Sequence, residues 1–99
     1  MVINILDHVK MASTYEDGEI IFKLISDAIS KGETVTLSFK DIQSVPSAFV
    51  NSAILRLLEI FRFQQIRDNL TFINTTKHIN DLIKSRFEFV LSEMEKTPD

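Results

Sequence analysis

The residues that could perform chemistry gather in the stretch Lys40–Ser47, between a predicted strand and a predicted helix. Asp41 offers a carboxylate there, and Ser44 and Ser47 offer hydroxyl groups. Asp41 lies at the carboxyl end of a strand, where open α/β sheets bind ligands, so it could sit beside a phosphate or a metal ion. The ordinary alternatives are a turn at Asp41 and a helix cap at Ser47, and the sequence leaves all of these roles open.

An enzyme built on this stretch would need a base within hydrogen-bond reach of a serine hydroxyl. His8 and His78 are the only histidines, and neither lies near the stretch in sequence or belongs to a cluster of metal ligands. A zinc site needs three or four converging ligands, the chain has no cysteine, and two glycines cannot build a glycine-rich phosphate loop. We therefore predict no catalytic, metal or cofactor site, and a small hydrolase is the less favoured alternative.

Composition and charge describe one globular domain. Of the 99 residues, 44% are hydrophobic and 25% are charged, an ordinary balance for such a domain. A net charge of −3 disfavours a nucleic-acid-binding protein, which normally has a basic face. The apolar runs are too short to cross a membrane, and the first residues lack the pattern of a signal peptide. We expect a cytoplasmic protein with its domain in residues 1–94 and a flexible tail in residues 95–99.

Strands and helices are predicted to alternate along the chain in the order β-α-β-α-β-α. The strands are expected over Val2–Leu6, Thr34–Phe39 and Leu70–Asn74. Such alternation is typical of a single α/β domain with a mixed or mostly parallel sheet. Apolar and polar residues alternate strictly within Thr34–Phe39, so the helices should cover mainly one face of the sheet. Residues 7–12 could hold a further edge strand.

The first helix is predicted from about Thr14 to Lys31, because apolar residues recur at helical spacing between these positions. A capping box could open it at Ser13 and Glu16 or, one residue later, at Thr14 and Asp17.

The second helix is predicted to be long and continuous. Pro46 suits its first position, and apolar residues continue at helical spacing as far as Phe61. Gln64–Asn69 is predicted to be a turn region that leads into the third strand. Polar residues at positions 74–76 can cap the last helix.

The strand-loop-helix segment LSFKDIQSVPSAFVNSAI, residues 37–54, resembles the core of STAS-like domains of unknown function from bacteria and their mobile elements. In that family a strand ending near a phenylalanine leads to an acidic or glycine position. A valine-serine-serine-phenylalanine-like turn follows, and then a helix that begins with small residues and asparagine. The matching residues here are Phe39, Asp41, Ser47, Phe49, Asn51 and Ala53, and the strand ending in Asn74 is similar as well. The resemblance implies a small sheet with helices mainly on one face.

The resemblance also implies a function. The better-known STAS proteins, the anti-sigma factor antagonists, act by partner switching, in which a kinase of the histidine-kinase-like fold phosphorylates a serine at the helix start. The added charge then dissolves the complex. Their helix start reads Asp-Ser-Ser-Gly with the second serine modified, whereas this chain has Pro46-Ser47-Ala48-Phe49. Ala48 thus stands in the modified position, and Ser44 and Ser47 are the hydroxyls nearby.

We accordingly predict a regulatory module that binds another protein and is not an enzyme. The candidate contact residues are Asp41, Ser44, Ser47, Asn51 and Ser52, the last three on the exposed start of the second helix. The partner could be a histidine-kinase-like ATPase. Alternatively, the chain could be a mobile-element protein that inhibits a host regulatory factor by surface binding.

Two aromatic residues, Phe63 and Phe89, fall outside the main apolar faces of the predicted helices. They could form an exposed patch at which the chain makes a homodimer, or they could close the bottom of the sheet.

Overall fold

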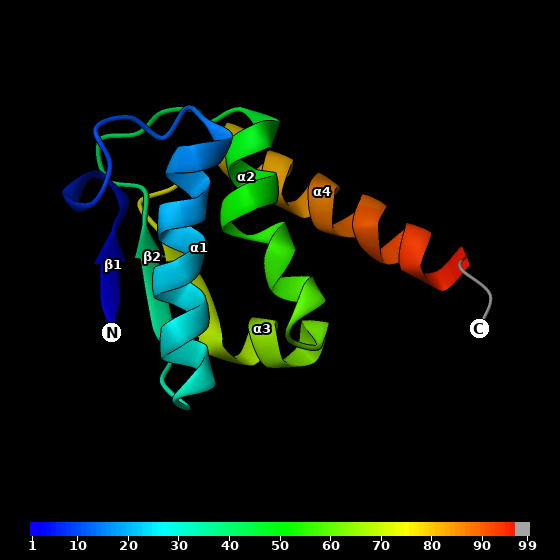
Figure 1. Cartoon of the computed structure of the whole chain (residues 1–99). Coiled ribbons are helices and arrows are strands. Elements are labelled where there is room, and N and C mark those ends of the chain that lie inside the picture. Colours follow the sequence, from blue (N-terminus) through cyan, green and yellow to red (C-terminus); the bar gives the residue numbers. More distant parts are fainter. Residues whose placement is uncertain (97–99) are drawn as a thin grey trace.

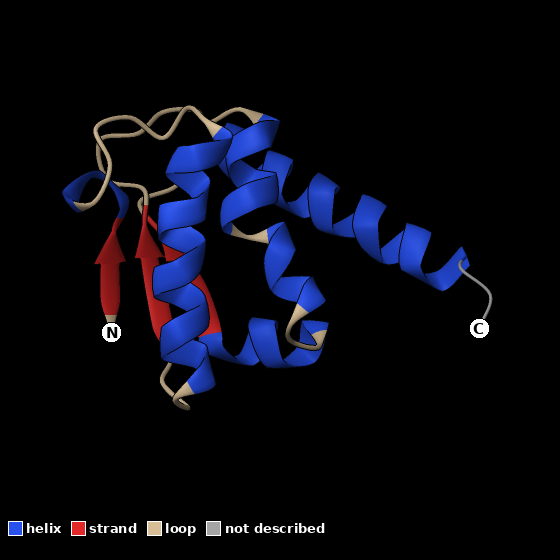
Figure 2. Ribbon diagram, in the orientation of Figure 1, coloured by secondary structure: helices blue, strands red, loops and turns tan. Residues whose placement is uncertain are grey.

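Figure 1 and Figure 2 show the computed structural model of the chain, which describes residues 1–96. The strands are β1 (Val2–Asn4), β2 (Val35–Ser38) and β3 (Leu70–Ile73). The α-helices are α1 (Tyr15–Ser30), α2 (Ser47–Ala53), α3 (Phe63–Asn69) and α4 (Lys77–Lys96). Short 3₁₀ helices, η1 (Ile5–Asp7) and η2 (Leu55–Glu59), follow β1 and α2.

The three strands form one parallel sheet in the order β1-β2-β3. Ile3 lies opposite Leu37, and Leu37 lies opposite Phe72, so one row of apolar side chains crosses the sheet. The predicted α/β fold with a parallel sheet is confirmed. Each strand is one or two residues shorter than the sequence predicted.

Helices cover one face of this sheet. Val35 and Leu37 on the helix side of β2 are 1% and 0% exposed. Val2 and Ile73 point to the other side, and they are 67% and 42% exposed. Figure 1 shows α1 lying in front of the strands, with α2 beside α1. The strict alternation of apolar and polar residues in the second strand therefore predicted the layer order correctly.

The beginning of α1 is fixed by a capping box at Thr14 and Asp17. The Thr14 Oγ1 accepts a hydrogen bond of 3.0 Å from the Asp17 backbone N–H, and Asp17 Oδ2 accepts one of 3.2 Å from the Thr14 N–H. Of the two predicted boxes, the later one forms. Gly32 follows the helix with a φ of +81°, a conformation that glycine adopts without steric cost.

The prediction of one continuous helix over residues 46–61 is wrong. The α-helix ends at Ala53, and η2 follows with a tighter winding. Ile54, Leu55 and Leu57 are all buried. In a 3₁₀ helix residues three apart lie directly above one another, so Ile54 and Leu57, joined by a 3.0 Å hydrogen bond from the Leu57 N–H to the Ile54 carbonyl oxygen, share the side that faces the core. Pro46 is the N-cap residue and not the first helical residue.

Two further connections differ from the prediction. The region predicted as a turn, residues 64–69, belongs to α3, whose Ile66 is 2% exposed. The apolar spacing of Phe63, Ile66 and Leu70 was the missed signal, because it places one side of a short helix on the core. Residues 7–12 form no strand, and Val9 and Ala12 anchor this connection to the core.

Helix α4 begins after β3 and projects beyond the other elements (Figure 1). The predicted cap is confirmed at Thr76, whose Oγ1 accepts a 3.2 Å hydrogen bond from the Ile79 backbone N–H. The helix extends to Lys96, and the remainder of the tail predicted at residues 95–99 lies outside the described residues. None of the helices in residues 1–96 has the length and apolar character needed to cross a membrane.

Candidate functional site

The loop after β2 turns sharply at Asp41. This residue has a φ of +65°, and the Ile42 backbone N–H donates a hydrogen bond of 2.9 Å to the Phe39 carbonyl oxygen. Aspartate tolerates the left-handed conformation better than most residues because its short side chain bonds locally. Asp41 therefore makes a turn, which is one of the two roles predicted for it. Its side chain is exposed to solvent.

The polar side chains under this loop hold the carboxyl ends of β2 and β3 together. Ser38 Oγ, which is buried, accepts a hydrogen bond of 2.9 Å from Asn74 Nδ2 and one of 3.3 Å from the Lys40 backbone N–H. Asn74 has a φ of +56°, so a second left-handed residue terminates the neighbouring strand. Asn4 lies opposite Ser38 in the register, and its buried Oδ1 has no hydrogen-bond partner among the described residues.

The far end of the loop is fastened to the start of α4. The Thr76 hydroxyl donates a hydrogen bond of 3.0 Å to the Gln43 carbonyl oxygen. Val45 is 4% exposed and inserts into the core, while Ile42 is half-buried. These anchors fix the backbone on both sides of Ser44, whose side chain stays exposed.

Ser47 is the first residue of α2, and its side chain is exposed. The prediction that it could cap this helix is wrong, because the N-cap position belongs to Pro46. Ser44 and Ser47 therefore both present their hydroxyls on a loop of fixed shape. Neither hydroxyl is part of the support that holds the loop.

Two of the predicted contact residues are turned inward. Ser52 is 0% exposed, and its hydroxyl donates a 3.2 Å hydrogen bond to the Phe49 carbonyl oxygen, so its predicted exposure is wrong. Asn51 is half-buried, and its Oδ1 accepts a 3.0 Å hydrogen bond from Arg86 Nε on α4. The missed signal for Ser52 was Gly18, since a glycine in a helix can mark a close helix–helix contact.

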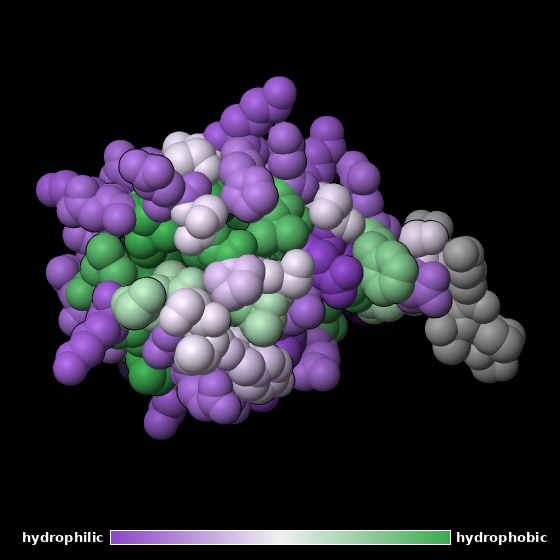
Figure 3. Space-filling view, turned by 90° about the horizontal axis from the view of Figure 1, so that it is seen from above, coloured by the Kyte–Doolittle hydropathy of each residue, from purple (hydrophilic) through white to green (hydrophobic). Residues whose placement is uncertain are grey.

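The surface around the loop contains both polar and apolar groups. Seen from above in Figure 3, an apolar band crosses the end of the molecule at which the strands terminate, and hydrophilic side chains border it. Leu6 and Met11, in the connection from β1 to α1, are 37% and 66% exposed. Among the described residues no group of three or more His, Cys, Asp or Glu is placed to hold a metal ion. Exposed hydroxyls and apolar groups on a fixed backbone can provide a contact surface for a protein.

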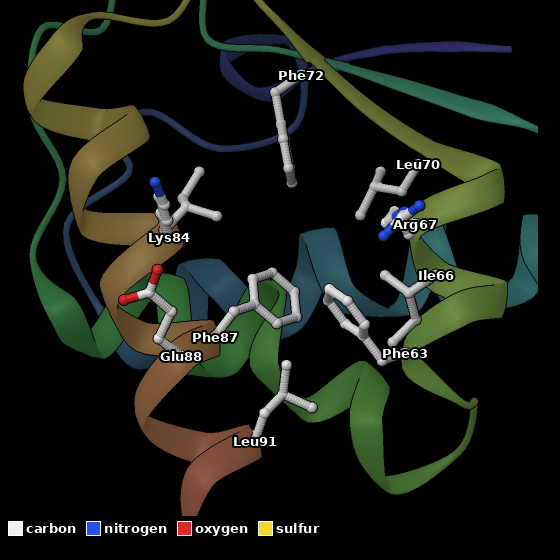
Figure 4. A pocket seen from close by; sticks show the side chains of 10 residues that line it. Phe63, Ile66, Arg67, Leu70, Phe72, Lys84, Phe87, Glu88 and Leu91 are labelled. Atoms are coloured by element: carbon white, nitrogen blue, oxygen red, sulfur yellow. The ribbon is translucent and has the colours of Figure 1, made fainter.

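A separate groove lies between α3, β3 and α4 (Figure 4). It encloses about 340 Å³. Its residues are mostly apolar, with three charged side chains: Phe63, Ile66, Arg67, Leu70, Phe72, Ile83, Lys84, Phe87, Glu88 and Leu91. The rings of Phe63 and Phe87 pack against each other in the groove, with centroids 5.4 Å apart and planes tilted by 59°. Of the two aromatic residues predicted to lie off the core, Phe63 is thus half-buried, and Phe89 is 54% exposed.

Comparison with known proteins identifies the family. A family model described as a STAS-like domain of unknown function (DUF4325) matches residues 17–80, which is more than half of the chain. The match contains all but the first two residues of α1, then β2, the loop, α2, η2, α3 and β3, and it leaves β1 and most of α4 outside. No curated protein and no solved structure matches the chain. With its strand-loop-helix unit inside the matched range, the chain belongs to the family of STAS-like domains of unknown function.

Proposed function

We propose that this chain is a cytoplasmic regulatory module that binds another protein without catalysing a reaction. The contact surface in this proposal is the loop Asp41–Ser47 together with the exposed first turn of α2. The observation that carries the proposal is the combination of a fixed backbone with outward side chains. Asp41, Ser44 and Ser47 are all exposed, whereas the backbone between them is held by buried and hydrogen-bonded neighbours.

A fixed loop suits recognition because little conformational entropy is lost when a partner binds. The side chain of Val45 and the hydrogen bond from Thr76 to the Gln43 carbonyl already order the segment in the free chain. The neighbouring apolar band in Figure 3 adds surface whose burial would favour association. Leu6 and Met11 contribute exposed apolar atoms from the β1–α1 connection.

The partner we favour is a histidine-kinase-like ATPase. This choice depends on the resemblance of the strand-loop-helix unit to the anti-sigma factor antagonists, in which the same helix start meets such an ATPase. Ala48 occupies the position of the modified serine, so the proposed complex does not depend on phosphorylation there. Ser44 and Ser47 act in the proposal as contact residues.

Affinity capture from the native cell, followed by mass spectrometry, tests the surface. The tagged wild-type chain should capture a histidine-kinase-like ATPase. The variants Ser47→Asp and Ser44→Arg should each weaken that binding roughly tenfold or more, because a charge at a desolvated contact is left without a partner. The recovered ATPase then allows the affinities to be measured by biolayer interferometry.

Ser30→Asp is the matched control. Ser30 is also an exposed serine, but it ends α1 at the opposite end of the molecule (Figure 1). It should bind as the wild type does, and circular dichroism should show that all three variants are folded. Undiminished binding by both loop variants would refute the proposed surface. Capture of a different protein class, with the same loss in the loop variants, would keep the surface and replace the ATPase.

A further inference from the structure

Helix α4 leaves much of its apolar side uncovered over its second half. The helix projects beyond the rest of the molecule in Figure 1. Val90 and Leu91 are only partly buried, and Met94 is 53% exposed. Isolated helices are marginally stable in water, and most helical stability in proteins comes from packing of an apolar face. Within the part of the chain that the structure describes, Phe87 and Val90 pack partly against the core, and the side of α4 that carries Leu91 and Met94 has less of the cover that usually stabilises such a segment.

Of these residues, Leu91 also lines the groove between α3, β3 and α4, whereas Val90 and Met94 lie beside α2 and η2. Figure 4 shows Phe87 and Leu91 on the α4 wall of the groove and Phe63 on the opposite wall. Lys84 and Glu88 lie on the α4 wall as well, one helical turn apart. A partner that entered this groove would meet apolar side chains and, beside them, one positive and one negative charge of α4.

The charges of α4 are divided between its two halves. Residues 77–86 have three basic residues and one acidic residue, whereas residues 87–96 have three acidic residues and one basic residue. This order opposes the helix dipole, which favours acidic residues near the amino end and basic residues near the carboxyl end. The first turn of α4 has no acidic residue. The charge order therefore makes a lone α4 less stable.

An antiparallel second copy of α4 removes this disadvantage. The basic half of one helix then lies beside the acidic half of the other, and the two dipoles also run in opposite directions. A twofold contact requires a surface that is complementary to itself, and a helix with opposite charges in its halves meets that requirement. We propose that two copies of this chain pair through α4 and the adjoining groove, with the helices antiparallel. In this dimer Lys84 of one copy faces Glu88 of the other.

Sedimentation velocity of the full chain over a range of concentrations tests the proposal. The wild type should sediment as a species of twice 11.4 kDa. Lys84→Glu and Glu88→Lys should each weaken self-association roughly tenfold, because each puts two like-charge contacts in place of two attractive ones. An equimolar mixture of the two variants should recover the dimer, since every contact between unlike copies is again attractive.

The mixture separates the interface from effects within one helix. Each variant keeps its like-charge pair, four residues apart in its own α4, so recovery on mixing can come only from contacts between copies. Leu91→Asp should also disrupt the dimer, and Phe89→Asp is its matched control. Phe89 is exposed on α4 and is absent from the residues that line the groove.

Several results would overturn the antiparallel dimer. A wild type that stays monomeric at every concentration would do so directly. A dimer that is unaffected by the single charge reversals would exclude the pairing of Lys84 with Glu88 of the other copy. A mixture that associates no better than either variant alone would exclude it as well. Dissociation by Phe89→Asp and not by Leu91→Asp would place the interface on a different side of α4.

Discussion

Replacement of Gly18 by alanine should destabilise the protein, because this glycine lies where α1 and α2 touch. A Cβ atom added at Gly18 would overlap the Ser52 Oγ. It would also lie 2.8 Å from the Phe49 carbonyl oxygen and 3.0 Å from the Ala53 backbone nitrogen. The serine hydroxyl can rotate away, but the two backbone atoms belong to α2 and cannot yield separately. The helices must therefore move apart, and the core between them loses contacts.

The size of this effect follows from two opposing contributions. Extra methyl groups in a well-packed core typically cost about 1–3 kcal/mol. Alanine is favoured over glycine by about 1 kcal/mol inside a helix, and Gly18 lies in the first turns of α1, where this gain is smaller. We expect a net loss of about 1–2 kcal/mol in the free energy of unfolding. For a domain of this size each kcal/mol lowers the melting temperature by roughly 4–8 °C.

Urea denaturation of the wild type and the variant measures this loss. Ser52→Ala removes the hydroxyl, so Gly18→Ala should cost less in that background but should still destabilise through the two backbone contacts. Gly32→Ala is the control, because Gly32 has no neighbour within 4 Å and only its φ of +81° resists a side chain. Gly32→Asn should recover most of that cost, since asparagine tolerates this conformation. A Gly18→Ala variant as stable as the wild type would refute the close contact between the helices.

Two further predictions concern caps and turns, and urea denaturation measures both. Thr14→Ala should lower the free energy of unfolding by about 1 kcal/mol, because the Asp17 backbone N–H loses its acceptor. Ser13→Ala should change this free energy little. Equal losses in the two variants would contradict the observed capping box. Asn74→Ala should lower the free energy of unfolding by about 2 kcal/mol. It loses the hydrogen bond to Ser38, and alanine tolerates the left-handed conformation, with its φ of +56°, less well than asparagine does. Asn74→Gly should recover the backbone part of that loss, and a Gly variant no better than Ala would contradict this explanation.

The fold was predictable because its main signals are periodic and local. Alternation in Thr34–Phe39 reports which face of a strand is buried, and this depends only on the strand's own geometry. The capping residues of α1 and α4 were predictable for the same reason, since a cap bonds to the backbone three residues away. The parallel sheet then follows from the order of the elements.

The errors lie where distant parts of the chain decide the local structure. The apolar spacing of residues 46–61 fits one helix, yet the α-helix ends at Ala53 and η2 continues with a tighter winding, in which the Leu57 N–H donates to the Ile54 carbonyl oxygen. Ser52 is polar and was therefore expected at the surface. It is buried because Gly18, 34 positions earlier in the chain, lets α1 approach it closely. No spacing within α2 contains that information.

The packing of the seven residues of α2 leaves few of them free to contact a partner. Phe49 and Val50 are buried in the core, Ser52 and Ala53 are closed off by α1, and Asn51 is bound to α4. Only the first two residues, 47 and 48, face outward together with the loop before them. A substitution after residue 48 therefore changes the packing of α2 before it changes any surface. If relatives in this family bind different partners through this unit, their differences should be concentrated in residues 41–48, where side chains can change while the helix stays in place.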